Sequence, residues 1–151
     1  LPETVAACAR HPMIQGIKEA TGNMFRAAQI REMCGPDFAL LSGDDFTLLP
    51  FLSVGGDGVI SVVTNVKPAL MADMCKAYAE GRLDDARKLH FQQLKLCELL
   101  FEDANPIPAK LAVSMMGIGS PEVRQPLREL APDSELGQRI QACMRELGVL
   151  N

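Results

Sequence analysis

The sequence offers little that would bind a metal through histidine, attract nucleic acid or enter a membrane. It contains no Trp, one Tyr and only two His residues, His11 and His90, which excludes a histidine-rich metal site. Its 15 Lys and Arg residues are outnumbered by 19 Asp and Glu residues, and no basic run is present that would attract a phosphate backbone. No apolar run is long enough to cross a bilayer. We therefore expect no nucleic-acid or membrane partner.

The five cysteines form an odd set without a closely spaced pair, which argues against a disulfide framework or a zinc site. Each of them falls in a segment whose pattern predicts a helix or a helix end. We interpret them as reduced, packed thiols of a cytoplasmic protein; they are Cys8, Cys34, Cys75, Cys97 and Cys143.

The first 66 residues alternate between helical and extended patterns. Residue spacing predicts helices at 1–10, 24–33 and 46–54, and short apolar runs predict strands at 13–20, 38–42 and 58–66. Near-continuous apolar strands between helices are typical of a parallel sheet covered by helices, because a sheet with one wet face shows alternation instead. The sequence therefore predicts an α/β fold in this part.

Beyond Val66 the pattern is helical only. Helices are expected at 68–80, at 84–102, from the Pro-rich "NPIP" to about residue 116, and after Ser134, which can cap the last one. We therefore divide the chain into residues 1–66, with the strands, and residues 67–151, with helices alone.

A lysine stands in the first predicted strand, in "IQGIKEA". In an extended chain Lys18 shares a face with Ile14, Gly16 and Ala20, while Ile17 and Glu19 point to the other face. Lys18 could be a strand-end lysine whose ammonium reaches water. Alternatively, it could be an amine in a desolvated site, where the neutral form becomes available to attack a ketone. The pattern alone leaves both interpretations open.

Four motifs narrow the choice. "GIKEATGN", "LLSGDD", "GGDGVIS" and "NPIPAK", in this order and at these intervals, resemble the dihydrodipicolinate synthases, pyruvate-dependent class I aldolases whose wider family includes N-acetylneuraminate lyase. The resemblance runs from Leu1 to about Lys110 and continues more loosely to the end. It implies the C-terminal part of a (β/α)8 barrel, with about three parallel strands in residues 1–66. Residues 67–151 would then be the last barrel helix and a C-terminal helical extension.

The resemblance also implies a reaction and a set of site residues. Lys18 would form a Schiff base with pyruvate, Ile60 would lie against the bound pyruvate, and Gly43 would allow close approach of the backbone. Asn105 matches a motif position, where it would shape the mouth of the barrel or cap the following helix. The implied reaction condenses pyruvate with aspartate semialdehyde in lysine biosynthesis. It needs no metal or organic cofactor.

Other motifs have plainer explanations. Asp44 and Asp45 could be paired carboxylates for a metal, but at a strand-to-helix turn we expect them to cap backbone amides. "GGDG" follows a predicted helix and enters a strand, whereas phosphate loops leave a strand and open a helix, so we interpret it as a helix end and turn. Tyr78 matches no motif position and receives no role.

The resemblance implies that parts of the enzyme lie outside this sequence. A barrel needs eight strands, and the family's tyrosine, threonine and arginine of the active site would all precede Leu1. We therefore expect the isolated chain to be inactive or severely impaired. Its first strand would also have an exposed edge, so we expect a complementary N-terminal half, an oligomer such as the tetramer common in the family, or a longer parent protein.

Two alternatives stay open. The chain could belong to another pyruvate aldolase of the same family, with a different aldehyde as substrate. It could also be a non-catalytic half-barrel that acts as an assembly or regulatory subunit.

Overall fold

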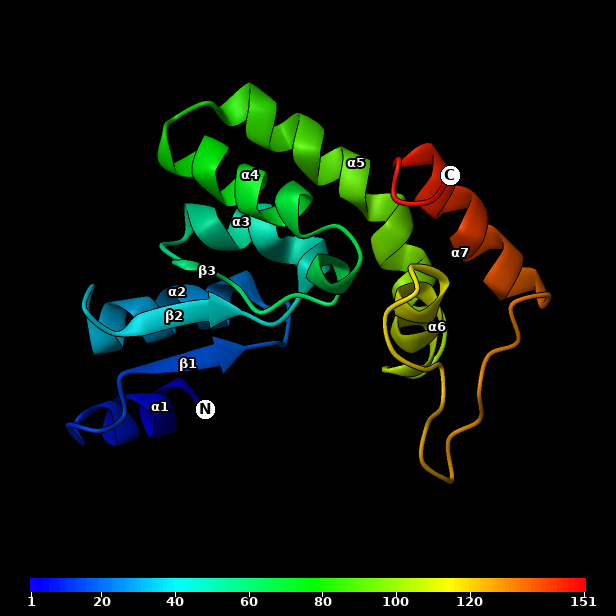
Figure 1. Cartoon of the computed structure of the whole chain (residues 1–151). Helices are drawn as coiled ribbons and strands as arrows, with labels where there is room; N and C mark the ends of the chain where they lie inside the picture. Colours follow the sequence, from blue (N-terminus) through cyan, green and yellow to red (C-terminus); the bar gives the residue numbers. More distant parts are fainter. The chain divides into compact units, whose positions relative to one another are not determined.

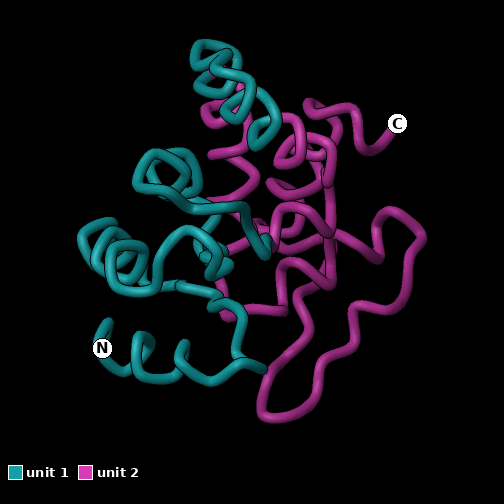
Figure 2. The backbone as a smooth tube through the Cα atoms, turned by 90° about the vertical axis from the view of Figure 1, so that its left-hand side faces the viewer, with its two compact units in different colours: residues 1–61, 74–87 teal, residues 62–73, 88–151 magenta.

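The computed structural model describes all residues, 1–151, and the chain forms two compact units (Figure 2). The first unit contains residues 1–61 and 74–87, and the second contains residues 62–73 and 88–151. The proposed division into residues 1–66 and 67–151 stays a prediction.

The first unit is built on three parallel strands in the order β1-β2-β3, which lie side by side in Figure 1. They are β1 (Gly16–Glu19), β2 (Ala39–Ser42) and β3 (Gly58–Val59). Lys18 is in register with Leu41, which is in register with Gly58. The predicted α/β class and the parallel sheet are therefore confirmed.

The third strand is much shorter than expected. A strand was predicted over 58–66, but β3 has two residues, and Val63–Asn65 form a 3₁₀ helix, η2. The Ile60 N–H donates to the Ser42 carbonyl at 2.8 Å, and Ser42 is the last residue of β2. Because a strand persists only while its neighbour offers backbone partners, β3 ends where β2 ends.

Helices of the first unit begin and end close to the expected residues. They are α1 (Pro2–Ala9), α2 (Met24–Cys34) and α3 (Leu48–Ser53), with the 3₁₀ helix η1 (Asp45–Thr47) before α3. The Asn23 side chain accepts the Arg26 N–H at 3.0 Å at the start of α2, and Gly35, with φ 79°, follows its end. The single helix predicted over 46–54 is instead split between η1 and α3.

The core of this unit lies on one face of the sheet. Leu40 of β2 is fully buried against Ala27 and Ile30 of α2 and Phe51 of α3, and Ile17 of β1 packs against the same cluster. Ile17 and Leu40 are in register and therefore point to the same side. Burial of such side chains stabilises the fold by roughly 1.5–3 kcal/mol each. We call this side of the sheet the covered face and the opposite side the open face.

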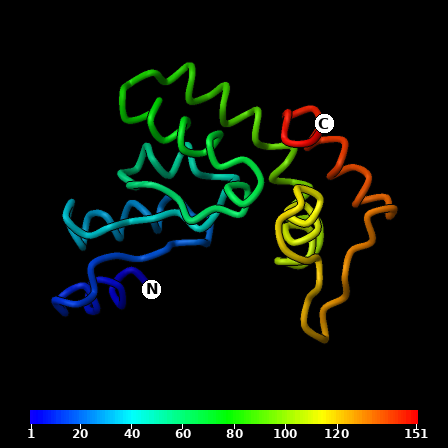
Figure 3. Tube along the Cα trace, in the orientation of Figure 1, coloured from blue at the N-terminus to red at the C-terminus, as the bar shows by residue number.

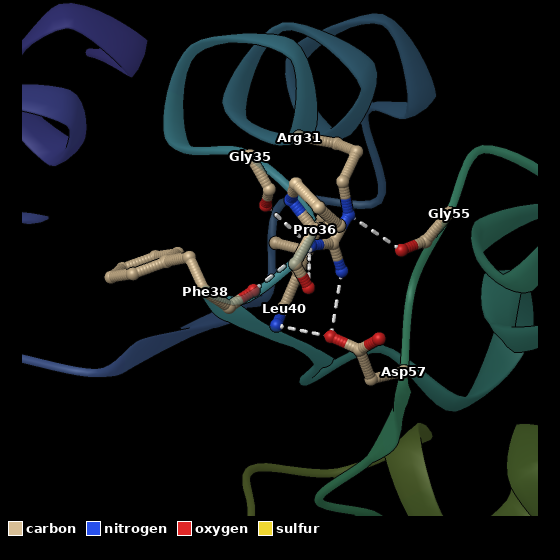
Figure 4. Close-up of polar contacts among 7 residues, drawn as sticks. All are labelled: Arg31, Gly35, Pro36, Phe38, Leu40, Gly55 and Asp57. Carbon is tan, nitrogen blue, oxygen red and sulfur yellow. Dashed lines mark hydrogen bonds and ion pairs between the residues drawn. The ribbon is translucent and has the colours of Figure 1, made fainter.

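A single arginine fastens the loops that enter the second and third strands (Figure 4). The Arg31 guanidinium of α2 donates to three carbonyls ahead of β2, and to the Gly55 carbonyl and the Asp57 carboxylate ahead of β3. Its distances are 2.8 Å to Gly55 and 2.6 Å to Asp57, and 2.8, 3.2 and 2.9 Å to Gly35, Pro36 and Phe38. The same Asp57 oxygen accepts the Leu40 N–H at 2.8 Å. We call this group the Arg31 knot.

The Arg31 knot shows what "GGDG" does. Gly55, with φ 93°, follows the end of α3, as the expected helix end and turn require. Asp57 additionally orients Arg31, a role that was not foreseen from the sequence.

The remaining helices match the helical pattern predicted beyond Val66. They are α4 (Pro68–Ala79), α5 (Leu83–Phe101), α6 (Ile107–Met115) and α7 (Glu135–Glu146). Ser134 accepts the Gly137 N–H at 3.1 Å and so caps α7, as predicted. Residues 117–134, between α6 and α7, contain no regular helix or strand and appear from yellow to orange in Figure 3. None of the helices combines the length and the apolar character that crossing a membrane requires.

Within the second unit, α6 packs against α7 and η2. The Lys67 ammonium donates to the Leu147 carbonyl after α7, and Arg139 of α7 pairs with Glu102 at 2.7 Å. Leu111 of α6 and Ile140 of α7 are buried.

The cysteines lie in helices, as expected, but they are not all packed. Cys97 and Cys143 are buried and Cys34 and Cys75 are half-buried, whereas Cys8 of α1 is exposed. The prediction of a packed thiol is therefore wrong for Cys8, because α1 reaches the core cluster through Val5.

Candidate active site

Lys18 lies on the open face of the sheet. It is the third residue of β1, between Ile17 and Glu19, which both point to the covered face. The Lys18 side chain therefore points away from the core formed with α2 and α3. It is exposed in this structure, so the chain alone does not enclose the amine that the second interpretation of Lys18 requires.

Gly43 directly adjoins the Lys18 side chain. It follows β2, and its N–H donates to the Glu19 carbonyl at 2.7 Å, which continues the ladder by one residue. A Cβ atom at Gly43 would lie 2.6 Å from Lys18 Cε and 2.6 Å from Ala20 Cβ. Contacts this short do not occur between real side chains, so the observed position of Lys18 requires a glycine at residue 43.

Ile60 completes the group on the open face. It stands two residues after Gly58, which is in register with Leu41, so its side chain points to the same side as Lys18. The side chain is 49% exposed. The structure thus brings three of the four predicted site residues, Lys18, Gly43 and Ile60, onto one face.

Asn105, the fourth residue, belongs to the second unit. It is exposed and stands just before α6, whose N-cap is Pro106 and has no side-chain cap. The suggestion that Asn105 caps this helix is therefore wrong, because the chain enters α6 one residue later. Asn105 instead lines a cavity of about 400 Å³ in the second unit.

Glu19 is a structural residue that the sequence analysis did not single out. Its carboxylate is 4% exposed, accepts the Thr21 hydroxyl at 2.7 Å and the Thr21 N–H at 3.2 Å, and lies 3.5 Å from Arg26 Nε. These contacts hold the "KEATG" turn after β1 against the start of α2. The sequence did contain a signal for this role: Glu19 falls on the covered face of the predicted strand, and Thr21 follows two positions later.

The two aspartates after β2 have separate environments. The Asp44 carboxylate accepts the Thr47 hydroxyl and makes no side-chain cap, so its predicted contact with a backbone amide is wrong. The backbone N–H of Asp44 itself donates to the Ser42 hydroxyl at 3.1 Å. Asp45 is buried at the start of η1. No three His, Cys, Asp or Glu side chains are grouped closely enough to hold a metal ion.

The open face has the chemical features of a site for a small carbonyl compound. It presents a primary amine packed against a glycine whose missing side chain leaves room for that amine, together with an apolar isoleucine. A primary amine can attack a ketone and form an imine without a metal or a cofactor.

Comparison with known proteins identifies the family. The sequence model of the dihydrodipicolinate synthetase family matches residues 1–143. The chain belongs to this family. It is 53% identical over 134 residues to the 4-hydroxy-tetrahydrodipicolinate synthase of Oleidesulfovibrio alaskensis, covering 88% of the chain and 46% of that protein. The synthase of Nitratidesulfovibrio vulgaris strain DP4 is 48% identical over 151 residues, covering 99% of the chain and 51% of that protein.

Solved structures with a similar fold come from the same family. The dihydrodipicolinate synthase of Thermotoga maritima superposes with a TM-score of 0.92 at 35% identity, over 99% of this chain and 52% of the other. The Acinetobacter baumannii enzyme, solved in complex with pyruvate, gives 0.89 at 31% identity, over 99% and 50%. The chain spans about half the length of the relatives it matches. The predicted family and the predicted partial (β/α)8 barrel are confirmed.

Proposed function

We propose that this chain contributes to a 4-hydroxy-tetrahydrodipicolinate synthase, which condenses pyruvate with aspartate semialdehyde for lysine biosynthesis in the cytoplasm. The names of the curated relatives support this reaction. The observation that carries the proposal is the placement of Lys18 on the open face, directly against Gly43 and on the same side as Ile60.

Lys18 acts as the nucleophile. Its neutral amine attacks the ketone carbon of pyruvate, a C–N bond forms, and the ketone oxygen leaves as water. The resulting iminium withdraws electrons, so the methyl carbon of pyruvate loses a proton and becomes an enamine carbon. That carbon then attacks the aldehyde carbon of aspartate semialdehyde and forms the new C–C bond.

The other site residues position the ligand. Gly43 leaves room for the Lys18 side chain itself, since any side chain at residue 43 would collide with Lys18. Ile60 provides an apolar wall on the same face. Pyruvate is the ligand that the Acinetobacter baumannii relative carries.

The chain needs a partner to work efficiently. Lys18 is exposed, so the chain alone does not enclose the imine or exclude water from it. Positioned proton transfer, which contributes about 10²–10⁴-fold to such reactions, also needs groups beside the imine. We propose that the other strands of a barrel, from an N-terminal half, and further copies in an oligomer such as a tetramer supply this enclosure.

Trapping with borohydride tests the role of Lys18. The chain is incubated with pyruvate and sodium borohydride, which reduces an imine to a stable secondary amine, and peptides are mapped by mass spectrometry. We expect an adduct at Lys18, formed faster when a chain that supplies the remaining strands is added. A folded sample with adducts spread evenly over its lysines would refute the proposal.

Exposure of Lys18 also favours a second candidate for the chain by itself: a non-catalytic half-barrel that assembles with, or regulates, another chain. Absence of any adduct at Lys18, with or without added strands, would support it. If the adduct forms, turnover with different aldehydes separates the synthase from another pyruvate aldolase of the family, because the synthase requires aspartate semialdehyde for its highest rate.

A further inference from the structure

Leu41 of β2 lies next to Lys18 on the open face. The two residues are in register between β1 and β2, and Leu40, the neighbour of Leu41 in the chain, is fully buried on the covered face. Because side chains alternate along a strand, Leu41 points to the open face, the same side as Lys18. Neighbouring strands lie about 4.8 Å apart, which brings the two side chains within reach of each other. Leu41 is half-buried in the chain.

The aliphatic stem of Lys18 crosses β2 at Gly43. Lys18 Cγ lies 3.0 Å and Lys18 Cε 2.6 Å from the position that a Cβ atom at Gly43 would take. Gly43 stands two residues after Leu41, and alternate residues along an extended chain share a face. The lysine therefore leans from its register partner, Leu41, toward the carboxyl end of β2. Leu41 borders the stem on the amino side.

Two other side chains border the stem beside Gly43. Ala20 Cβ lies 2.6 Å from the same Cβ position at Gly43, on the β1 side. Ile60 lies on the β3 side, where the pairing of β2 with β3 continues past the end of both strands. Of these three neighbours, Leu41 is the one on the amino side of the lysine stem.

Gly58 leaves Leu41 with one large neighbour in its row. Gly58 is in register with Leu41, and a Cβ atom there would lie 3.6 Å from Leu41 Cδ2, an ordinary van der Waals contact. The row across the sheet thus contains a lysine, a leucine and a glycine. A bulky side chain beside a lysine stem limits the staggered rotamers that the stem can adopt. Leu41 therefore restricts Lys18 to rotamers that lean toward Gly43.

We propose that Leu41 is a positioning residue for the imine chemistry: its side chain packs on the amino side of the Lys18 stem and directs the amine toward the carboxyl end of the sheet. The inference rests on the proposed function, because it takes Lys18 as the residue that forms the imine with pyruvate. Leu41 acts through the lysine. Its loss should therefore change the rate of imine formation more than the affinity for pyruvate.

Truncation of Leu41 tests the proposal in the full chain. Leu41→Ala gives the lysine stem space on its amino side, and we expect borohydride trapping of pyruvate at Lys18 to slow by about tenfold. The pyruvate concentration that gives half the maximal rate should change by less than about twofold. Leu41→Met conserves the volume of the side chain and should keep the rate within about twofold of that of the unaltered chain.

A smaller truncation covers the case in which Leu41→Ala does not fold. Leu41→Val removes one methylene from the open face and suits a strand, and it should slow trapping by about threefold. Ile17→Val is the matched control, because it removes one methylene from the covered face of β1. It should lower the midpoint of urea denaturation and leave the trapping rate unchanged.

A double-mutant cycle separates positioning of Lys18 from a general loss of packing. In Gly43→Ala the lysine is already displaced, since the new Cβ would lie 2.6 Å from Lys18 Cε. Adding Leu41→Ala to this variant should slow trapping by less than about twofold further, because both substitutions act on the same side chain. Two independent packing defects would instead multiply their effects.

An unchanged trapping rate in folded Leu41→Ala or Leu41→Val, or effects that multiply in the double variant, would overturn the proposal. Its failure is distinguishable from failure of the proposed function. If the unaltered chain forms no pyruvate adduct at Lys18, the imine role is refuted and the role of Leu41 with it. An adduct at Lys18 whose rate does not respond to residue 41 refutes the positioning role alone.

Discussion

The amino ends of the sheet and its open face differ in how tightly their polar groups are held. At the amino ends, the Arg31 guanidinium contacts four carbonyls and a carboxylate, and its side chain is only 17% exposed. On the open face, Lys18 is exposed and has no hydrogen-bond partner in the chain. Arg31 therefore stabilises the loops ahead of the strands, whereas Lys18 is available to a ligand.

The contrast follows the usual division of parallel barrels. Residues at the amino ends of the strands serve stability, whereas chemistry uses side chains at or near the carboxyl ends. The Arg31 knot lies ahead of β2 and β3, and Gly43 and Ile60 directly follow the ends of the same two strands. Substitutions in the two regions should therefore affect different measurements.

Loss of the Lys18 amine should have the largest effect on chemistry. In Lys18→Ala we expect the total amount of borohydride-trapped pyruvate to fall to the level of the remaining lysines, because no other primary amine replaces the one on this face. The free energy of unfolding should change by less than about 0.5 kcal/mol, since the side chain is exposed. Lys76→Ala, on α4 and 68% exposed, is the control and should keep the adduct at Lys18. A Lys18→Ala protein that traps as much pyruvate in total as the unaltered chain would remove the contrast altogether.

Disruption of the Arg31 knot should lower stability most. Arg31→Met removes the Arg31 donor from the Asp57 carboxylate and from four loop carbonyls, and we expect a loss of about 2–4 kcal/mol in the free energy of unfolding. Urea denaturation measures this loss. Adduct formation at Lys18 should persist where the variant is folded.

Arg82→Met is the comparison for this substitution. Arg82 pairs with Glu80 and Asp85 through exposed side chains, and such pairs contribute little to stability. An equal loss of stability in the two variants would contradict the special role of the Arg31 knot.

An added methyl group at residue 43 should slow imine formation on the open face, although the Lys18 amine is still present. In Gly43→Ala the new Cβ would lie 2.6 Å from Lys18 Cε, so the lysine must move. We expect trapping of pyruvate to slow by about 10- to 100-fold, since misplacement by about 1 Å has effects of this size. Gly58→Ala is a matched control on the same face, because its Cβ would meet only Leu41 Cδ2, at 3.6 Å. Equal rates in both variants would show that Gly43 does not position Lys18.

Local signals in the sequence predicted the elements and the side on which Lys18 lies. Asn23 and Ser134 cap helices where the residue types suggested, and strand alternation placed Lys18 opposite Ile17 and Glu19. These features depend on neighbours within a few residues. The sequence motifs likewise predicted the family.

Features that depend on distant residues were missed. Arg31 and Asp57 are 26 residues apart, and nothing in either local pattern indicates that they meet. The length of β3 depends on where β2 ends, so its β-branched sequence alone predicted too long a strand. Exposure of Lys18 depends on what covers the open face, which periodicity cannot supply.

The smallest expected effect on stability comes from Glu19, the neighbour of Lys18 in the chain. In Glu19→Gln one carboxylate oxygen is lost from the contacts with Thr21 and Arg26, and we expect the free energy of unfolding to fall by about 1 kcal/mol. Glu32→Gln, on an exposed part of α2, should change it by less than about 0.5 kcal/mol. Pyruvate trapping at Lys18 should keep its rate in both variants, because Glu19 acts on the covered face. A slower reaction in Glu19→Gln at unchanged stability would mean that the two faces are coupled through the turn after β1.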